Sequence, residues 1–203
     1  MENFQLTLDG LLRELRAENK RPSLLLQSCC GPCSSYVLEY LSQYFAVTVY
    51  YSNSNIWPPE EYDKRLSEQK RLIREASFPD VTLLDSRYEP EVFYEAVKGL
   101  ETEPEGGARC PVCFRMRLED TAREAKLRGF DYFGTTLTVS PHKNAPLINE
   151  IGREIGEKIG VSWLPADFKK RSGYLRSIQL SKEYALYRQD YCGCQFSFRG
   201  ELK

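Results

Sequence analysis

The feature that most constrains the fold is a strand–turn–helix–strand pattern over residues 23–51. Residues 23–28 form a short apolar run typical of a buried strand, and residues 46–51 form a second run rich in β-branched and aromatic residues. Between these runs, apolar side chains recur at helical spacing. Two strands joined through a helix are parallel, and the crossover between them is right-handed. The pattern therefore predicts a βαβ unit.

Strands and helices continue to alternate along the rest of the chain. Further strands are predicted at residues 81–85, 130–138 and 161–164. Helices are predicted after Pro58-Pro59, after Cys113, and over residues 147–159 and 173–187. We therefore expect an α/β fold: a single three-layer domain over residues 23–203, with a mainly parallel sheet and a C-terminal helical and Cys-x-Cys segment. Residues 1–22 are expected to form an N-terminal helical extension.

Composition and charge exclude several classes of protein. The chain has 203 residues, of which 41% are hydrophobic and 28% charged, with a net charge of -1. These values are ordinary for a globular protein and exclude a fibrous or wholly disordered chain. No apolar run approaches the roughly 20 residues that cross a bilayer, and the N-terminus lacks the features of a secretion signal. We expect a cytoplasmic protein with no membrane partner.

Seven cysteines accompany a single histidine, His142. An odd number of cysteines in a chain without a secretion signal favours a reducing compartment, where thiolates bind metals or carry redox chemistry. Cys29, Cys30 and Cys33 follow the first predicted strand at the start of its helix, which we name the first thiol turn. Ligands bind at this position in open α/β sheets, and a helix N-terminus favours thiolate. Plain buried cysteines are the alternative interpretation.

Two further cysteine pairs extend this pattern. Cys110 and Cys113 form a C-x-x-C motif, the second thiol turn, which alone is a redox pair or half of a metal site. Four thiolates from the two turns suit zinc or an iron–sulfur cluster, and the irregular spacing favours the cluster. Cys192 and Cys194 form a C-x-C pair, which is a strained redox-active disulfide, a source of metal ligands, or two unrelated thiols.

Residues 169–188 carry six basic side chains against one acidic side chain, with three interleaved tyrosines. Basic groups neutralise phosphates while aromatic rings stack on unpaired bases. The segment is therefore a candidate RNA-binding surface, with an ordinary solvated helix as the alternative. The sequence contains neither a P-loop motif nor a Rossmann glycine fingerprint.

Four blocks of the sequence together carry a family resemblance. They are C-C-G-P-C-S ending a buried strand, Y-S-N-S-N-I at 51–56, R-C-P-V-C-F-R-M-R-L at 109–118, and L-Y-R-Q-D-Y-C-G-C at 186–194. The T-T-L-T-V-S-P run at 135–141 fits as well. In combination these blocks resemble the cobalamin-independent epoxyqueuosine reductases of the QueH type.

The resemblance implies a HUP-like, Rossmann-like fold and reduction of epoxyqueuosine to queuosine at the wobble position of tRNA. It also implies that Cys29, Cys30, Cys110 and Cys113 ligate a [4Fe–4S] cluster, with Cys33 beside an additional iron ion. The same resemblance makes Cys192 and Cys194 the redox-active disulfide. The partners it implies are an external electron donor and the anticodon stem-loop of tRNAs with a GUN anticodon.

Turning an epoxide into an alkene takes two electrons and two protons and releases the oxygen as water. An acid must protonate that oxygen, and Asp167 and His142 are the candidates. Two other functions remain open. A HUP-like ATP-dependent tRNA thiolase would need a glycine- and serine-rich turn where this chain has cysteines. A zinc-stabilised RNA-binding module would use the same thiolates structurally.

Overall fold

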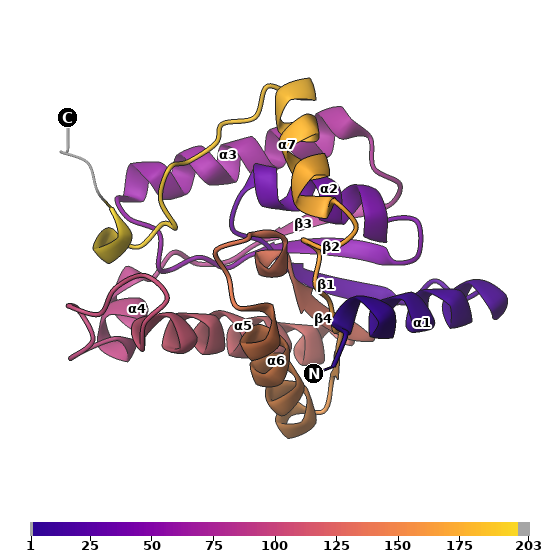
Figure 1. Cartoon of the computed structure of the whole chain (residues 1–203), viewed down its shortest axis with the longest axis horizontal. Helices are drawn as coiled ribbons and strands as arrows, with labels where there is room; N and C mark the ends of the chain where they lie inside the picture. The colour runs from indigo at the N-terminus through magenta and orange to yellow at the C-terminus, as the bar shows by residue number, and fades with distance from the viewer. Residues whose placement is uncertain (1, 199–203) are drawn as a thin grey trace.

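Five strands form a sheet at the centre of the molecule, in the spatial order β3-β2-β1-β4-β5 (Figure 1). The computed structural model describes residues 2–198 of the chain. The strands are β1 (Ser23–Gln27), β2 (Ala46–Tyr51), β3 (Val81–Asp85), β4 (Tyr132–Thr135) and β5 (Ser162–Trp163). Neighbouring strands are all parallel, so their carboxyl ends open at one edge of the sheet. The strand order reverses between β1 and β4, the position at which open α/β sheets bind ligands.

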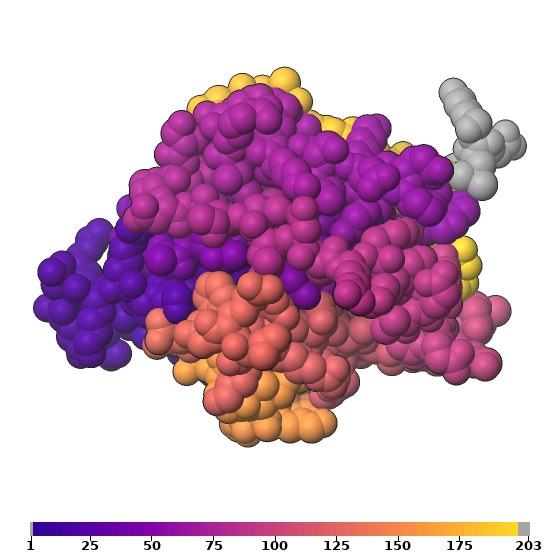
Figure 2. All heavy atoms as spheres, turned by 180° about the vertical axis from the view of Figure 1, so that it is seen from behind, coloured from indigo at the N-terminus to yellow at the C-terminus, as the bar shows by residue number. Residues whose placement is uncertain are grey.

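Helices cover both faces of this sheet. On one face lie α1 (Phe4–Ala17), α2 (Gly31–Leu41) and α3 (Pro59–Ala76), and on the other α5 (Arg109–Arg128) and α6 (Ala145–Ile159). The helix α7 (Gly173–Glu183) packs on α2, and α4 (Pro90–Ala96) lies beside the start of α5 (Figure 1). From behind, α3 covers the upper layer, and α5 and α6 form the lower one (Figure 2). These layers confirm the predicted three-layer, Rossmann-like α/β fold.

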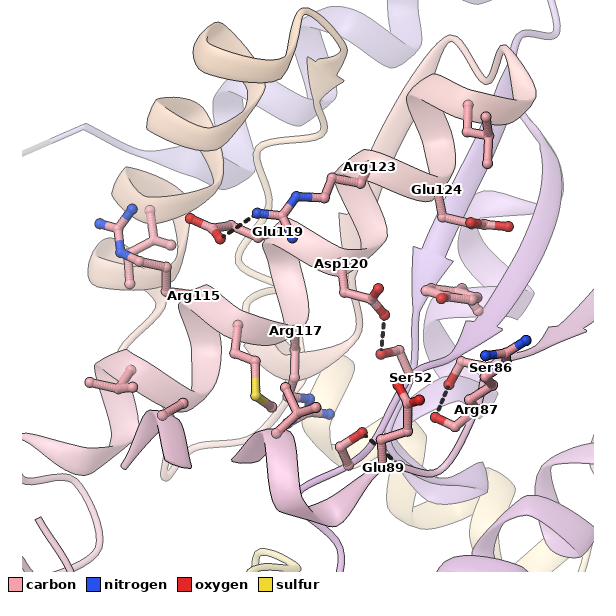
Figure 3. A pocket seen from close by; sticks show the side chains of 18 of the residues that line it. Ser52, Ser86, Arg87, Glu89, Arg115, Arg117, Glu119, Asp120, Arg123 and Glu124 are labelled. Atoms are coloured by element: carbon pink, nitrogen blue, oxygen red, sulfur yellow. Dashed lines mark hydrogen bonds and ion pairs between the residues drawn. The ribbon is translucent and has the colours of Figure 1, made fainter. Parts of the chain in front are cut away.

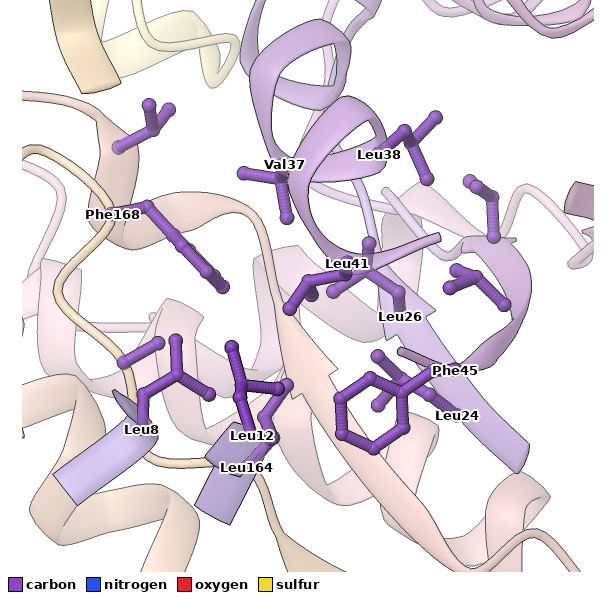
Figure 4. Close-up of a cluster of buried hydrophobic side chains, with 14 of the residues drawn as sticks. Leu8, Leu12, Leu24, Leu26, Val37, Leu38, Leu41, Phe45, Leu164 and Phe168 are labelled. Carbon is purple, nitrogen blue, oxygen red and sulfur yellow. The ribbon is translucent and has the colours of Figure 1, made fainter. Parts of the chain in front are cut away.

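The alternating side chains of β1 divide the core in two. Leu24 and Leu26 face α1 and α2, whereas Leu25 faces α5 and α6, and all three are fully buried. Successive residues of a strand point to opposite faces of its sheet, so a strand buried on both faces is apolar throughout. Figure 4 shows Leu24 and Leu26 in the apolar cluster that β1 forms with α1 and α2.

The N-terminal helix α1 contributes to that same cluster. Leu8, Leu12 and Leu15 lie on one face of α1 and are buried against β1 and α2. Figure 4 shows Leu8 and Leu12 in this cluster. The Asn3 side chain accepts a hydrogen bond from the Leu6 amide at 3.3 Å and so caps the start of the helix. Burying each leucine stabilises the fold by about 1.5–3 kcal/mol, so α1 is joined to the α/β unit by its core.

Several predicted elements are shorter in the structure than in the sequence pattern. The strand predicted at 130–138 ends at Thr135, because Thr136 takes helical dihedral angles and a 3-10 turn, η1 (Leu137–Val139), follows. The helix predicted over 173–187 ends at Glu183, since Ala185 adopts a positive φ of 47°. The strand predicted at 161–164 is reduced to two residues. In the described part of the chain, no helix is both long and apolar enough to span a membrane.

Candidate functional site

The carboxyl ends of β1, β2 and β4 are held together by buried side-chain hydrogen bonds. Gln27 Nε2 donates to the carbonyl oxygen of Ser52 at 3.1 Å, and Thr135 Oγ1 donates to Gln27 Oε1 at 2.7 Å. Asn53 Nδ2 donates to the carbonyl oxygen of Ser28 at 2.7 Å. Buried polar groups paired in this way are rigid, so they fix the backbone from which the first thiol turn emerges.

The first thiol turn lies at this edge of the sheet, where α2 begins. The Sγ atoms of Cys29, Cys30 and Cys33 lie within 4.8 Å of one another, and those of Cys29 and Cys30 are 3.7 Å apart. Two thiolates bound to one tetrahedral zinc at about 2.3 Å would be separated by about 3.8 Å. The group of three cysteines is therefore compact enough to hold a metal ion.

The three cysteines of the first thiol turn differ in the pKa of their thiols. Hydrogen bonds from Cys30 and Cys33 hold the pKa of the Cys29 thiol well below its ordinary value. The hydrogen bond with Cys29 raises the pKa of Cys30 to about 12, and bonds with Cys29 and Cys30 raise the pKa of Cys33 well above its ordinary value. One thiolate is thus favoured over three, because like charges repel in a buried site. Full ionisation needs an added cation, which a metal ion supplies.

A serine and glutamine cluster supports this turn from behind. Ser28 Oγ and Ser34 Oγ donate to Gln69 Oε1 at 2.9 and 2.7 Å, and Ser34 Oγ also lies 2.9 Å from the carbonyl oxygen of Cys30. All three side chains are buried. Both ends of the turn are therefore tied to α3.

A cavity of about 370 Å³ opens beside the first thiol turn. It is lined by Cys29 and Cys33, by His142 and Lys143 from the loop after η1, and by Cys192 near the C-terminus. The structure thus brings together two of the three predicted cysteine motifs and the single histidine. These residues are up to 163 positions apart in the sequence, from Cys29 to Cys192.

The second thiol turn lies in the first turn of α5. Cys113 is buried, and it packs with Cys194 and with Phe93 of α4. Burial raises the pKa of the Cys113 thiol to about 12. Cys110 packs against the apolar cluster that contains Cys29 and Cys30, and its Sγ accepts a hydrogen bond from the Gly106 amide at 3.2 Å. Within residues 2–198, Cys29, Cys30 and Cys33 are the cysteines gathered tightly enough for one metal ion.

The segment that carries Cys192 and Cys194 is anchored on α3. Arg65 Nη1 donates to the carbonyl oxygen of Cys192 at 3.2 Å, and the Trp57 amide donates to that of Gly193 at 2.8 Å. Arg65 is itself held by Glu61 at 2.6 Å. Cys192 and Cys194 are free thiols in the structure.

Lys143 is a residue of the site that the sequence reasoning missed. Its Nζ atom lies 2.9 Å from Cys192 Sγ and 3.0 Å from Glu105 Oε1, and its side chain is 8% exposed. Burial raises the pKa of the Cys192 thiol, and the ammonium charge of Lys143 lowers it, with a net rise. The sequence offers no signal for this contact beyond the position of Lys143 next to His142.

Arg117 is a second residue that the sequence reasoning missed. It is 2% exposed, and its Nη2 donates to Asn53 Oδ1 at 2.7 Å. Burial lowers the pKa of Arg117, and the charges of Cys113, Cys29 and Cys192 raise it by more. A signal was present in the sequence, since Arg117 follows Cys113 by one helical turn.

A larger cavity of about 980 Å³ lies on the other side of α5, and Arg117 lines both cavities. Figure 3 shows its polar wall, where Ser52 donates a hydrogen bond to Asp120 at 2.5 Å. Among the described residues, no cysteine lines this cavity. Cys29, Cys33 and Cys192 all line the smaller cavity instead.

The two predicted acids, Asp167 and His142, differ in their relation to the smaller cavity. Asp167 is buried and forms an ion pair with Lys169 at 2.9 Å, and Lys169 Nζ lies 3.5 Å from the carbonyl oxygen of Lys143. Asp167 is not among the described residues that line the cavity, whereas His142 is.

Within the basic segment 169–188, part of the charge is neutralised by other elements. Arg171 pairs with Asp9 of α1, and Arg176 pairs with Glu39 of α2. Tyr174 and Arg188 line the cavity. The segment therefore reaches the cavity at Tyr174 and Arg188, and its ion pairs tie it to α1 and α2.

Comparisons with known proteins identify the family of this chain. The family model for epoxyqueuosine reductase QueH matches residues 24–200. A protein of that name from Streptococcus pyogenes serotype M1 is 43% identical over 96% of this chain and 78% of its own length. One from Staphylococcus epidermidis is 43% identical over 97% of this chain and 87% of its own length. One from Thermotoga maritima is 38% identical over 86% of this chain and 90% of its own length. The chain belongs to the epoxyqueuosine reductase QueH family.

Proposed function

We propose that this protein reduces epoxyqueuosine to queuosine at the wobble position of tRNA. The observation that carries the proposal is the 370 Å³ cavity, where the first thiol turn, Lys143 and Cys192 face the same space. Oxidisable thiols and proton-bearing groups around one ligand-sized cavity suit the two-electron reduction of a substrate. Family membership supports the same reaction.

The size of the cavity supports a nucleoside as the ligand. Ligand pockets commonly measure about 300–1,000 Å³, so this one suits a single modified nucleoside and excludes a base-paired duplex. Enzymes that act on a base take it out of the stack, and RNA loops present unpaired bases. We therefore propose the anticodon loop of a GUN-anticodon tRNA as substrate, with Tyr174 and Arg188 among the residues that would contact it in the cavity.

The cysteines fit an iron–sulfur cluster in their chemistry. Cys29, Cys30, Cys110 and Cys113 would hold a [4Fe–4S] cluster, and Cys33 would bind an additional iron ion. Their soft sulfur donors lie at the N-terminal ends of α2 and α5, and a bound metal would supply the positive charge that the buried thiolates need. A cluster of this kind supplies electrons one at a time.

The dithiol and its neighbours would balance the reaction. When Cys192 and Cys194 form a disulfide they release two electrons and two protons. The epoxide takes up the two electrons and the two protons. Its two C–O bonds break, and its oxygen leaves as water. An external electron donor then returns the disulfide to the dithiol. Lys143 holds a proton 2.9 Å from Cys192 Sγ, and His142 and Asp167, the latter through Lys169, are the further proton-bearing candidates.

A zinc-stabilised RNA-binding module is the second candidate function. The 3.7 Å separation of Cys29 and Cys30 Sγ also suits one zinc ion. The ATP-dependent thiolase is not favoured, because cysteines occupy the turn after β1.

The test is turnover under anaerobic conditions. Iron-loaded protein, dithionite and tRNA that carries epoxyqueuosine should yield queuosine, measured by mass spectrometry of the digested nucleosides. Cys192→Ser should leave the iron content unchanged and slow the reaction. If the iron-loaded protein leaves epoxyqueuosine intact while it still binds the tRNA, the reductase proposal is wrong and the RNA-binding module is favoured.

A further inference from the structure

Arg117 is a buried cation whose partners within the protein do not balance its charge. Its guanidinium donates one hydrogen bond, from Nη2 to the neutral amide oxygen of Asn53, and its Nε atom has no partner among the described residues. Among residues 2–198, no carboxylate forms an ion pair with it. Arg65 is equally buried, but it pairs with Glu61 at 2.6 Å.

An unpaired charge in a protein interior is strongly unfavourable, and arginine does not lose its proton in proteins. The fold therefore places Arg117 beside an anion that the remaining carboxylates do not provide. The position of Arg117 identifies that anion. It lies one helical turn after Cys113, lines the cavity together with Cys29 and Cys192, and contacts Asn53, which holds the carbonyl oxygen of Ser28.

We propose that Arg117 is the built-in counterion of metal-bound thiolates in this site. Cysteines that bind a metal lose their protons, and the three thiolates of the first thiol turn around one divalent ion carry a net charge of about -1. A buried guanidinium that lines the same cavity balances part of that negative charge. Arg117 is a positioning residue in this sense, because it acts through the cysteines. The inference rests on the proposed thiolate metal centre and is independent of the tRNA reaction.

This role predicts different effects in the metal-free and metal-bound protein. Replacing Arg117 by methionine removes a buried charge and fills a similar volume, which is often neutral or stabilising. Asn53 Oδ1 keeps a donor after the change, since Gln27 Nε2 lies 3.3 Å away. Metal-free Arg117→Met should therefore melt at the temperature of the wild type or higher. The metal-bound thiolates would lose their counterion, so metal affinity should fall.

Arg109 offers a matched control on the same helix. It is 1% exposed, it forms no ion pair among the described residues, and its Nε and Nη2 have no hydrogen-bond partner there. Its Nη1, however, lies 3.0, 3.0 and 2.5 Å from three backbone carbonyl oxygens of the preceding loop, and these carry partial negative charge. Arg109→Met leaves these acceptors without their donor, so it should lower the melting temperature of the metal-free protein. The two substitutions are chemically identical, and their effects on the metal-free protein should differ in direction.

The experiment uses Co²⁺ as the probe, because its thiolate charge-transfer absorption reports binding directly. Affinity is measured by competition with a chelator in the wild type, Arg117→Met and Arg117→Lys. The methionine variant should bind Co²⁺ about tenfold more weakly or worse, because a buried positive charge is lost from the cavity that Cys29 and Cys33 line. The lysine variant keeps the charge and should remain close to the wild type.

Equal Co²⁺ affinity in Arg117→Met and the wild type would overturn the inference. A lysine variant as weak as the methionine variant would also overturn it, because shape and not charge would then be responsible. Reductase turnover does not enter these measurements. If Co²⁺ binding follows the expected order and the wild type does not reduce epoxyqueuosine, the proposed reaction fails and the counterion role stands.

Discussion

Gly193 lies between Cys192 and Cys194. Its replacement by alanine should displace from α3 the segment that carries these two cysteines. Its φ is +132°, a backbone conformation that residues with a side chain rarely adopt. A Cβ at this position would lie 3.1 Å from Arg65 Nη1 and 3.2 Å from Ile56 Cγ1. Both contacts are closer than ordinary van der Waals contact, so Arg65 or the segment itself has to move.

The cost follows from the backbone. A residue forced into a sparsely populated conformation costs about 1–3 kcal/mol, and we take about 2 kcal/mol for Gly193→Ala. The strain is relieved when the segment separates from α3, so the equilibrium between docked and displaced forms shifts by about 30-fold. The hydrogen bond from the Trp57 amide to the Gly193 carbonyl oxygen, 2.8 Å long, breaks in the displaced form.

Hydrogen exchange at the Trp57 amide measures this equilibrium. Protection of that amide should fall by about 30-fold in Gly193→Ala, because the opening is local. Gly129→Ala is the control: Gly129 also has a positive φ, +74°, but it ends α5 where a Cβ would meet no other part of the described chain within 4 Å. It should reduce overall stability and leave Trp57 protection in the folded state unchanged. Unchanged Trp57 protection in Gly193→Ala would refute the close approach on which this reasoning depends.

Three further predictions concern the dithiol, the core and the cluster ligands. Lys143→Met should raise the pKa of the Cys192 thiol and shift its alkylation by iodoacetamide to higher pH, because the ammonium group that favours the thiolate is lost; an unshifted pH profile would contradict this. Leu12→Ala should lower the free energy of unfolding by about 2–5 kcal/mol in urea titrations, and a loss under about 1 kcal/mol would show that α1 is not part of the core. Cys113→Ala should lose cluster iron in a colorimetric assay, whereas full retention would remove Cys113 from the proposed ligands.

The sequence predicts the sheet well wherever a strand is bounded by clear turns. The runs at 46–51 and 81–85 coincide with β2 and β3, because β-branched residues there are followed by polar turn residues. The strand predicted at 130–138 is too long, because Thr136, Thr138 and Val139 have strand propensity but lie in or beside the η1 turn. At these residues, tertiary packing overrides the local strand propensity.

The cysteine motifs are visible in the sequence, but their relations in space are not. Spacing alone predicts that Cys29, Cys30 and Cys33 share one turn, as the structure confirms. The contact of Lys143 with Cys192 joins residues 49 positions apart, and nothing local encodes it. Arg117 is visible as a basic residue one turn after Cys113, yet its unbalanced charge emerges only when the carboxylates around it are known.

We propose that thiolates of this chain hold an iron–sulfur cluster that serves a reduction. Iron and acid-labile sulfide analysis of protein purified without oxygen, with a visible spectrum, tests it most directly. We expect about four irons and four sulfides per chain, more iron if the additional ion is bound, and a brown absorbance that bleaches with dithionite. One zinc per chain with no sulfide and no colour would contradict this claim.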